Sequence, residues 1–67
     1  MKIELDRKKI DICRARKKMS VAELAEAYGV SRARMNVIIN QREVTPVSAG
    51  RLADALGVDV LEIMEMD

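Results

Sequence analysis

The stretch VAELAEAYGVSRARMNVIIN, residues 21–40, decides the fold of this chain. Its small and branched apolar residues recur at the spacing of two short helices that cross at a steep angle. Ala25 stands where the two helix backbones come closest, and Gly29 stands where the chain must turn sharply, often at a positive φ that a residue with a Cβ resists. The stretch is typical of a helix-turn-helix, which places its second helix in the major groove of DNA.

The second helix of this motif has an apolar back and a polar front. Val30, Met35 and Ile38 form the back, so the opposite face is free to be read against base edges. Arginine can place two donors on guanine, asparagine can bridge the N6 and N7 atoms of adenine, and small apolar side chains can meet thymine methyl groups. Base contacts are expected from Arg32, Ala33, Arg34, Asn36 and Val37. Which of the two arginines reads a base stays open, because either can hold a phosphate instead.

Phosphate contacts are expected at the two edges of the motif, where donors flank the reading helix. One group precedes the first helix of the motif, one residue caps the second helix, and one group follows it. The expected phosphate-binding residues are Lys17, Lys18, Ser20, Ser31, Asn40, Gln41 and Arg42.

Capping signals place helices on both sides of the reading helix. Ser20 and Glu23 form a capping box for a helix over residues 21–28, and Ser31 caps a helix over residues 32–40. On the N-terminal side, the alternation of residues 2–5 predicts an extended start, and Asp6 begins a helix through about residue 17. Ile10 and Cys13 are expected to face inward from that helix, with Arg14 as a further candidate for an inward position.

The C-terminal third reads as two more helices. Thr45 and Pro46 start a helix that runs to residue 56, and Gly50 within it is interpreted as permitting close contact with a neighbouring helix. Gly57 ends that helix, and a second capping-box pattern at residues 59–62 starts a short helix from residue 60 to about Met66. No linker divides the chain. The predicted fold is all-α, a compact five-helix bundle in a single domain over residues 1–67, with the helix-turn-helix at its second and third helices.

Composition excludes several classes of protein. A chain of 67 residues makes one small domain, and this one has no His, Trp or Phe and a single Cys, so most catalytic and metal-binding groups are missing. We expect no enzymatic activity, no metal, no cofactor and no small-molecule ligand. No apolar run approaches the roughly 20 residues of a membrane span, and the charged N-terminus does not read as a signal peptide. A cytoplasmic location is expected.

The charges divide unevenly along the chain. Residues 1–42 hold eleven Lys and Arg against five acidic residues, whereas residues 43–67 hold one Arg against six acidic residues. A protein that meets a polyanion places its cations on the contacting side, although solvated helix faces would give a similar count. Cys13 is interpreted as a small core residue, with a redox-sensing thiol beside basic neighbours as the alternative.

The segment MSVAELAEAYGVSRARMNVIINQREVTPVSAGRLADALGVDVLEIME, residues 19–65, resembles the Cro and phage-repressor type of helix-turn-helix, also called the XRE family. The resemblance implies a domain of the lambda-repressor-like DNA-binding type that binds operator DNA, usually as a dimer, and regulates transcription in a bacterium, phage or mobile element. Three positions depart from the family pattern. Val21 replaces a common Gln, Gln41 replaces a common Gly, and Ile39 replaces a Glu that pairs with an Arg of the first helix. Without that Glu, Arg14 is free to face DNA or solvent, which is the alternative to an inward position.

Two functions follow from these observations. The first is a sequence-specific regulator, expected to be a repressor, that binds double-stranded DNA at a two-fold operator with half-sites roughly 34 Å apart. A homodimer, at least on DNA, would use the fourth or last helix, and a monomer that pairs on DNA is equally consistent. The second is a protein-interaction module such as an antitoxin or anti-repressor, acting through the acidic, Met-rich tail. Core packing or a homodimer contact is the plainer reading of that tail, whose apolar residues are Leu61, Ile63, Met64 and Met66.

Overall fold

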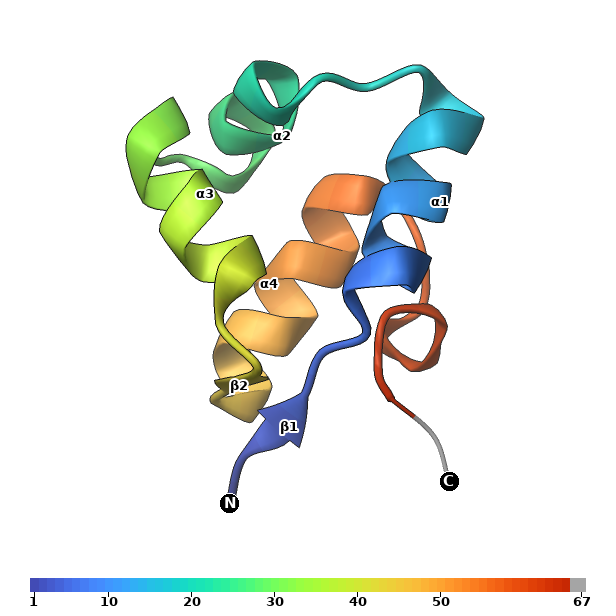
Figure 1. Ribbon diagram of the computed structural model, residues 1–67, viewed down its shortest axis with the longest axis vertical. Coiled ribbons are helices and arrows are strands. Elements are labelled where there is room, and N and C mark those ends of the chain that lie inside the picture. The colour runs from blue at the N-terminus through green and yellow to red at the C-terminus, as the bar shows by residue number, and fades with distance from the viewer. Residues whose placement is uncertain (66–67) are drawn as a thin grey trace.

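The helices begin and end close to the residues that carry capping signals. The computed structural model describes residues 1–65 of the chain and is shown in Figure 1. Its four α-helices are α1 (Arg7–Lys17), α2 (Val21–Tyr28), α3 (Arg32–Asn40) and α4 (Pro46–Leu56). Four helices lie where they were predicted, and each is preceded by a residue whose side-chain oxygen accepts a backbone N–H: Asp6, Ser20, Ser31 and Thr45.

The caps explain why the helices are separate. Ser20 and Glu23 form the predicted capping box, with each side chain bonded to the backbone N–H of the other residue. Gly29 and Gly57 end α2 and α4 at φ of +95° and +70°, a conformation in which a Cβ is strained. Lys18 ends α1 in the same left-handed region, at φ +53°. A cap of the Ser or Thr kind typically stabilises a helix by about 1 kcal/mol.

The predicted fifth helix is wrong within the described residues, because only a 3-10 turn, η1 (Val60–Glu62), follows α4. The predicted capping box between Asp59 and Glu62 does form. The helix cannot continue because Ile63 is drawn into the core and its carbonyl accepts the N–H of Asp6 at 2.9 Å. The predicted end of that helix at Met66 lies outside the described residues.

A small sheet holds the N-terminal segment between two later parts of the chain. Strand β1 (Ile3–Glu4) confirms the extended start and pairs antiparallel with β2 (Glu43–Val44), which lies between α3 and α4. On the other side, Leu5 forms an antiparallel bridge with Met64. The segment that follows α3 is thereby tied to the start of the chain, as the neighbouring strands in Figure 1 show.

Every helix contributes to one hydrophobic core. Cys13 is 3% exposed and Ala25 is 2% exposed, in agreement with the predicted core positions. Burying a side chain of leucine size stabilises a fold by about 1.5–3 kcal/mol, so this cluster is the main source of stability. The largest fully buried side chains are Ile10, Leu24, Met35, Ile39, Leu52, Leu56 and Ile63.

The interpretation of Gly50 is wrong, because a Cβ built at this position would have no atom within 4 Å. No neighbouring helix therefore requires a glycine there.

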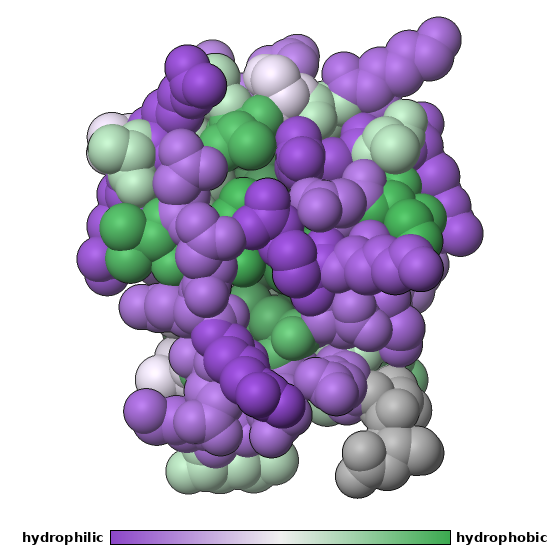
Figure 2. Space-filling view, in the orientation of Figure 1, coloured by the Kyte–Doolittle hydropathy of each residue, from purple (hydrophilic) through white to green (hydrophobic). Residues whose placement is uncertain are grey.

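The surface is mainly hydrophilic in the view of Figure 2, with apolar side chains visible between the polar ones. Among residues 1–65, no helix combines the length and the apolar character that a membrane crossing requires.

Candidate nucleic-acid interface

The turn between α2 and α3 is closed by Ala25. Its carbonyl accepts the N–H of Gly29 at 2.8 Å and the N–H of Val30 at 2.9 Å, so the chain reverses within a few residues of the end of α2. Val30 is partly buried against the core, as expected for the apolar back of the motif. This turn fixes α3 across the end of α2, at one edge of the molecule in Figure 1.

The exposed face of α3 contains all five residues predicted to contact bases. Met35, Ile38 and Ile39 point into the core, whereas the five predicted residues are all exposed. Because successive residues of an α-helix are rotated by about 100°, Ala33 and Val37 follow one line along the middle of this face. The same rotation places Arg32 and Asn36 along one side of that line and Arg34 on the other side. The arrangement brings together the predicted base readers: Arg32, Ala33, Arg34, Asn36 and Val37.

The two arginines of α3 have no acidic partner among residues 1–65. The ion pairs within the described residues involve Arg7, Arg14 and Arg16, all of them on α1. The guanidinium groups of Arg32 and Arg34 are therefore available to a ligand without first breaking an internal ion pair.

The serines at the edges of the interface serve as helix caps. Ser20 and Ser31 are exposed, and their hydroxyl oxygens accept the N–H of Glu23 and of Arg34, each at 3.1 Å. Each hydroxyl keeps its own proton to donate. The backbone N–H of Ser20 is already taken by the carboxylate of Glu23 at 2.9 Å, and this bond is the main cause that lowers the pKa of Glu23 below its ordinary value.

The remaining predicted phosphate-binding residues do not all lie together. Four of them are exposed next to the motif: Lys18, Asn40, Gln41 and Arg42. Lys17 instead lies with its Nζ against Gly57, at the end of α4. A cation there offsets the partial negative charge of the C-terminal end of a helix, so the structure separates Lys17 from the rest of the predicted set.

Arg14 faces inward, which confirms one of its two predicted orientations and contradicts the other, toward DNA or solvent. Its side chain is only 20% exposed, its Nη2 lies 3.1 Å from the carboxylate of Asp11, and its Nη1 donates to the carbonyl of Met19 at 3.0 Å. Burial raises the pKa of Asp11 to some extent, but the hydrogen bonds from Arg14 and Arg7 outweigh burial and lower this pKa below its ordinary value. Asp11, within α1 itself, thus supplies the partner that Ile39 cannot.

The other two departures from the family pattern have simple structural outcomes. Val21 packs partly buried against the core, and its side chain has no donor or acceptor for a hydrogen bond at the start of α2. Gln41 caps α3 at an ordinary φ of −72°, so glycine is not required at the end of this helix.

Sequence reasoning missed one residue beside the interface. Arg7, at the start of α1, donates from Nη1 to the side-chain oxygen of Asn40 at the end of α3. The two residues are 33 positions apart, so no local pattern links them. The pairing of β1 with β2 brings them together, because it fastens the segment before α1 to the segment after α3.

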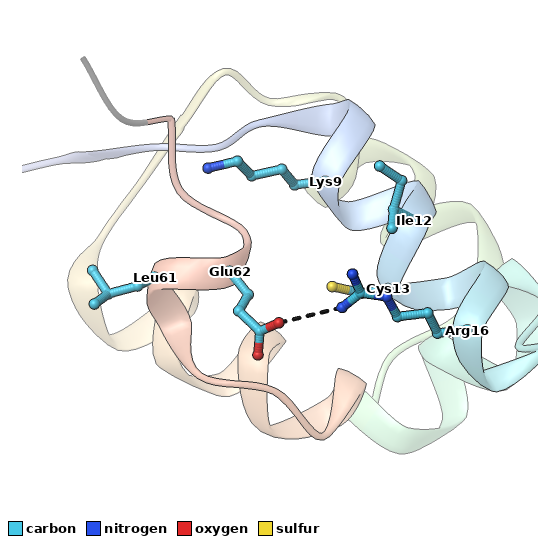
Figure 3. A pocket seen from close by; sticks show the side chains of 6 residues that line it. All are labelled: Lys9, Ile12, Cys13, Arg16, Leu61 and Glu62. Carbon is cyan, nitrogen blue, oxygen red and sulfur yellow. Dashed lines mark hydrogen bonds and ion pairs between the residues drawn. The ribbon is translucent and has the colours of Figure 1, made fainter.

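The apolar residues of the tail are partly consumed by the fold, in agreement with the core-packing reading. Ile63 is fully buried and Leu61 is 55% exposed, while Met66 lies outside the described residues. Between α1 and η1 the surface forms a hollow, crossed by an ion pair of 3.4 Å between Arg16 and Glu62 (Figure 3). The residues that line this hollow are Lys9, Ile12, Cys13, Arg16, Leu61 and Glu62.

The fold and the exposed face of α3 define a class of protein, the helix-turn-helix DNA-binding domains. A family model described as the Cro/C1-type HTH DNA-binding domain matches residues 9–67. The chain therefore belongs to the Cro/C1-type family, which confirms the resemblance and makes this a DNA-binding protein of transcription regulation. Searches of curated proteins and of solved structures gave no significant match.

Proposed function

We propose that the protein is a transcriptional repressor that binds a two-fold operator as a homodimer, with α3 of each copy in the major groove. The observation that carries the proposal is the exposed face of α3, whose arginines have no ion-pair partner within residues 1–65. An α-helix fits the major groove, and each base pair presents a distinct pattern of donors and acceptors there.

The layout of α3 suggests how the half-site is read. Ala33 and Val37, the latter 49% exposed, would meet thymine methyl groups in the middle of the contact. Arg32 and Asn36 on one side would pair with guanine and adenine, and Arg34 on the other side would bind guanine or a phosphate. Each bidentate contact contributes about 1–3 kcal/mol of discrimination, so one or two of these side chains dominate specificity.

Phosphate contacts would fix the register of α3 on the duplex. Lys18 and Ser20 flank the start of α2, and Ser31 caps α3 itself. Asn40, Gln41 and Arg42 would hold the strand at the far end of α3. Lys17 makes a weaker contribution in this proposal, because its amino group lies at the end of α4.

The dimer would place two copies of α3 roughly 34 Å apart, one turn of the duplex. The two elements that were expected to form the contact each expose an apolar side chain: Val47 of α4 is 72% exposed and Leu61 of η1 is 55% exposed. Apolar area at the centre of a contact, with charged residues around it, is what a dimer interface of modest size needs.

Selection from a pool of random duplexes tests the proposal. The purified protein is incubated with the pool at two salt concentrations, and the retained duplexes are sequenced. The expected result is a two-fold motif with binding that weakens as salt rises, since each neutralised phosphate adds about 0.9 to the log–log slope. Retention without a motif would overturn sequence-specific recognition, and no retention at either salt concentration would overturn DNA binding.

A further inference from the structure

A chain of polar contacts runs along α1 and joins the two edges of the interface. It begins at Asn40, the last residue of α3, which accepts a hydrogen bond from Arg7. The Nε of Arg7 donates to both carboxylate oxygens of Asp11, at 3.2 and 3.3 Å. Asp11 also accepts from Arg14, and Arg14 donates to the carbonyl of Met19, which directly precedes the cap of α2.

The contact with Arg7 fixes the orientation of the Asn40 side chain. A guanidinium group has only donors, so the amide must present its oxygen to Arg7. The amide NH₂ of Asn40 then points away from Arg7, and both of its protons are free for an acceptor outside this pair. Asn40 is exposed, so that acceptor can come from solvent or from a ligand.

Arg7 keeps donors of its own. Its Nε is bonded to Asp11 and its Nη1 to Asn40, but the contacts within residues 1–65 leave Nη2 without an acceptor. The side chain is 44% exposed. Two adjacent donor groups, one of them cationic, therefore lie at the C-terminal end of the reading helix.

We propose that Arg7 is a DNA-contacting residue, and that Nη2 of Arg7 and the NH₂ of Asn40 together bind one phosphate at the outer end of the half-site. The inference rests on the proposed function, because it requires α3 to lie in the groove. The family match begins at residue 9 and so does not include Arg7. The carboxylate of Asp11 holds the guanidinium group of Arg7 through its Nε, so Arg7 and Asn40 are already oriented for the phosphate before DNA binds.

The test compares Arg7→Gln with a matched control, Arg16→Gln. Both arginines lie on α1 and pair with one carboxylate, but Arg16 pairs with Glu62, beside η1 rather than α3. Binding is measured by fluorescence anisotropy with the random-sequence duplex pool and with its most enriched member, over a series of salt concentrations. Arg7→Gln is expected to reduce the log–log salt slope by about 0.9 and to weaken binding about tenfold at about 0.1 M salt, whereas Arg16→Gln leaves the slope unchanged.

Two further variants separate a DNA contact from a purely structural tie between α1 and α3. Arg7→Lys keeps the charge and is expected to keep the salt slope while losing several-fold in affinity, since an ammonium group cannot hold Asn40 and a phosphate in one plane. Asn40→Ala combined with Arg7→Gln is expected to cost less than the two single changes together. A structural tie would instead lower the thermal midpoint and leave the slope as it is in the wild type.

The outcomes distinguish this inference from the proposed function. If the wild-type protein binds neither duplex, both fail. If the wild-type protein binds and Arg7→Gln behaves like Arg16→Gln, only the assignment of Arg7 is overturned.

Discussion

The arginines of α1 and those of α3 have opposite surroundings. Arg7, Arg14 and Arg16 of α1 each contact a carboxylate, whereas Arg32 and Arg34 of α3 contact none within residues 1–65. The cause is visible in the sequence of the helices. Helix α1 contains Asp11 and lies beside Glu62, whereas α3, RARMNVIIN, has no acidic residue. The same side chain thus has an internal ion-pair partner on one helix and none on the other.

The position of the α3 arginines strengthens this contrast. Both lie in the first turn, where the partial positive charge of the helix N-terminus disfavours a cation by about 0.3–1 kcal/mol. An unfavourable local charge without an internal partner is typical of a residue kept for a ligand.

The largest expected effect comes from removing both free arginines. Arg32→Ala with Arg34→Ala removes up to two bidentate contacts of about 1–3 kcal/mol each, so operator affinity should fall by roughly two to four orders of magnitude. The thermal midpoint should stay the same or rise slightly, because an unfavourable interaction with the helix dipole is lost. Anisotropy titration and thermal unfolding followed by circular dichroism measure the two quantities. Operator binding that survived the double substitution would show that the arginines of α3 are not the main DNA contacts.

The paired arginine Arg14 should show the reverse behaviour. Arg14→Ala leaves the carboxylate of Asp11 and the carbonyl of Met19 without this donor, which should lower the free energy of unfolding by about 1–3 kcal/mol. Denaturant unfolding measures this change. DNA affinity, measured at a temperature where the variant is folded, should change less than threefold. A large loss of affinity in the folded variant would place Arg14 with the α3 arginines instead.

The ion pairs of α1 also predict a pH dependence of stability. The pKa of Asp11 is lowered in the folded protein, so the ionised carboxylate contributes stability that is present above its ordinary pKa, 3.8, and is lost as the pH falls through the lower folded value. Unfolding by urea should therefore become easier below about pH 4. Asp11→Asn should flatten this part of the profile. Glu23→Gln is the matched control, because Glu23 is the other carboxyl whose pKa is lowered in the folded protein. An Asp11→Asn profile identical to that of the wild type would contradict the assignment.

The smallest effect is expected at Arg16. Its guanidinium and Glu62 are 67% and 46% exposed and 3.4 Å apart, and exposed pairs of this kind contribute about 0–1 kcal/mol. Arg16→Ala should leave both the operator affinity and the thermal midpoint nearly unchanged. A clear loss of affinity would show that the DNA interface extends to the hollow between α1 and η1.

Local signals predicted most of the helices. Side-chain caps at Ser20, Ser31 and Thr45 act within three residues, and so a reader of the sequence can place the starts of α2, α3 and α4. The exposed face of α3 follows from its periodicity in the same way. The predicted roles of its side chains on DNA remain predictions.

Two of the errors have a common physical cause, which is contact between distant segments. Strand β2 exists because residues 3–4 pair with it, and the last helix stops because Ile63 packs into the core. Arg14 differs from these two cases, because its partners Asp11 and Met19 are only three and five residues away, although the family pattern suggested a partner on α3. The contacts of β2 and of Ile63, by contrast, leave no mark in a short window of sequence.

The sheet has a consequence for the order in which the protein is made. The segment of β1 is synthesised before the helices, yet Leu5 and Asp6 have partners at Met64 and Ile63, more than 50 positions further along the chain. The bridge from Leu5 to Met64 and the bond from Asp6 to Ile63 can form only after residues 63–64 have been synthesised, whereas the pairing of β1 with β2 needs nothing beyond residue 44. The helix-turn-helix and the contact between Arg7 and Asn40 can therefore form before the C-terminal segment fastens the start of α1 from the other side.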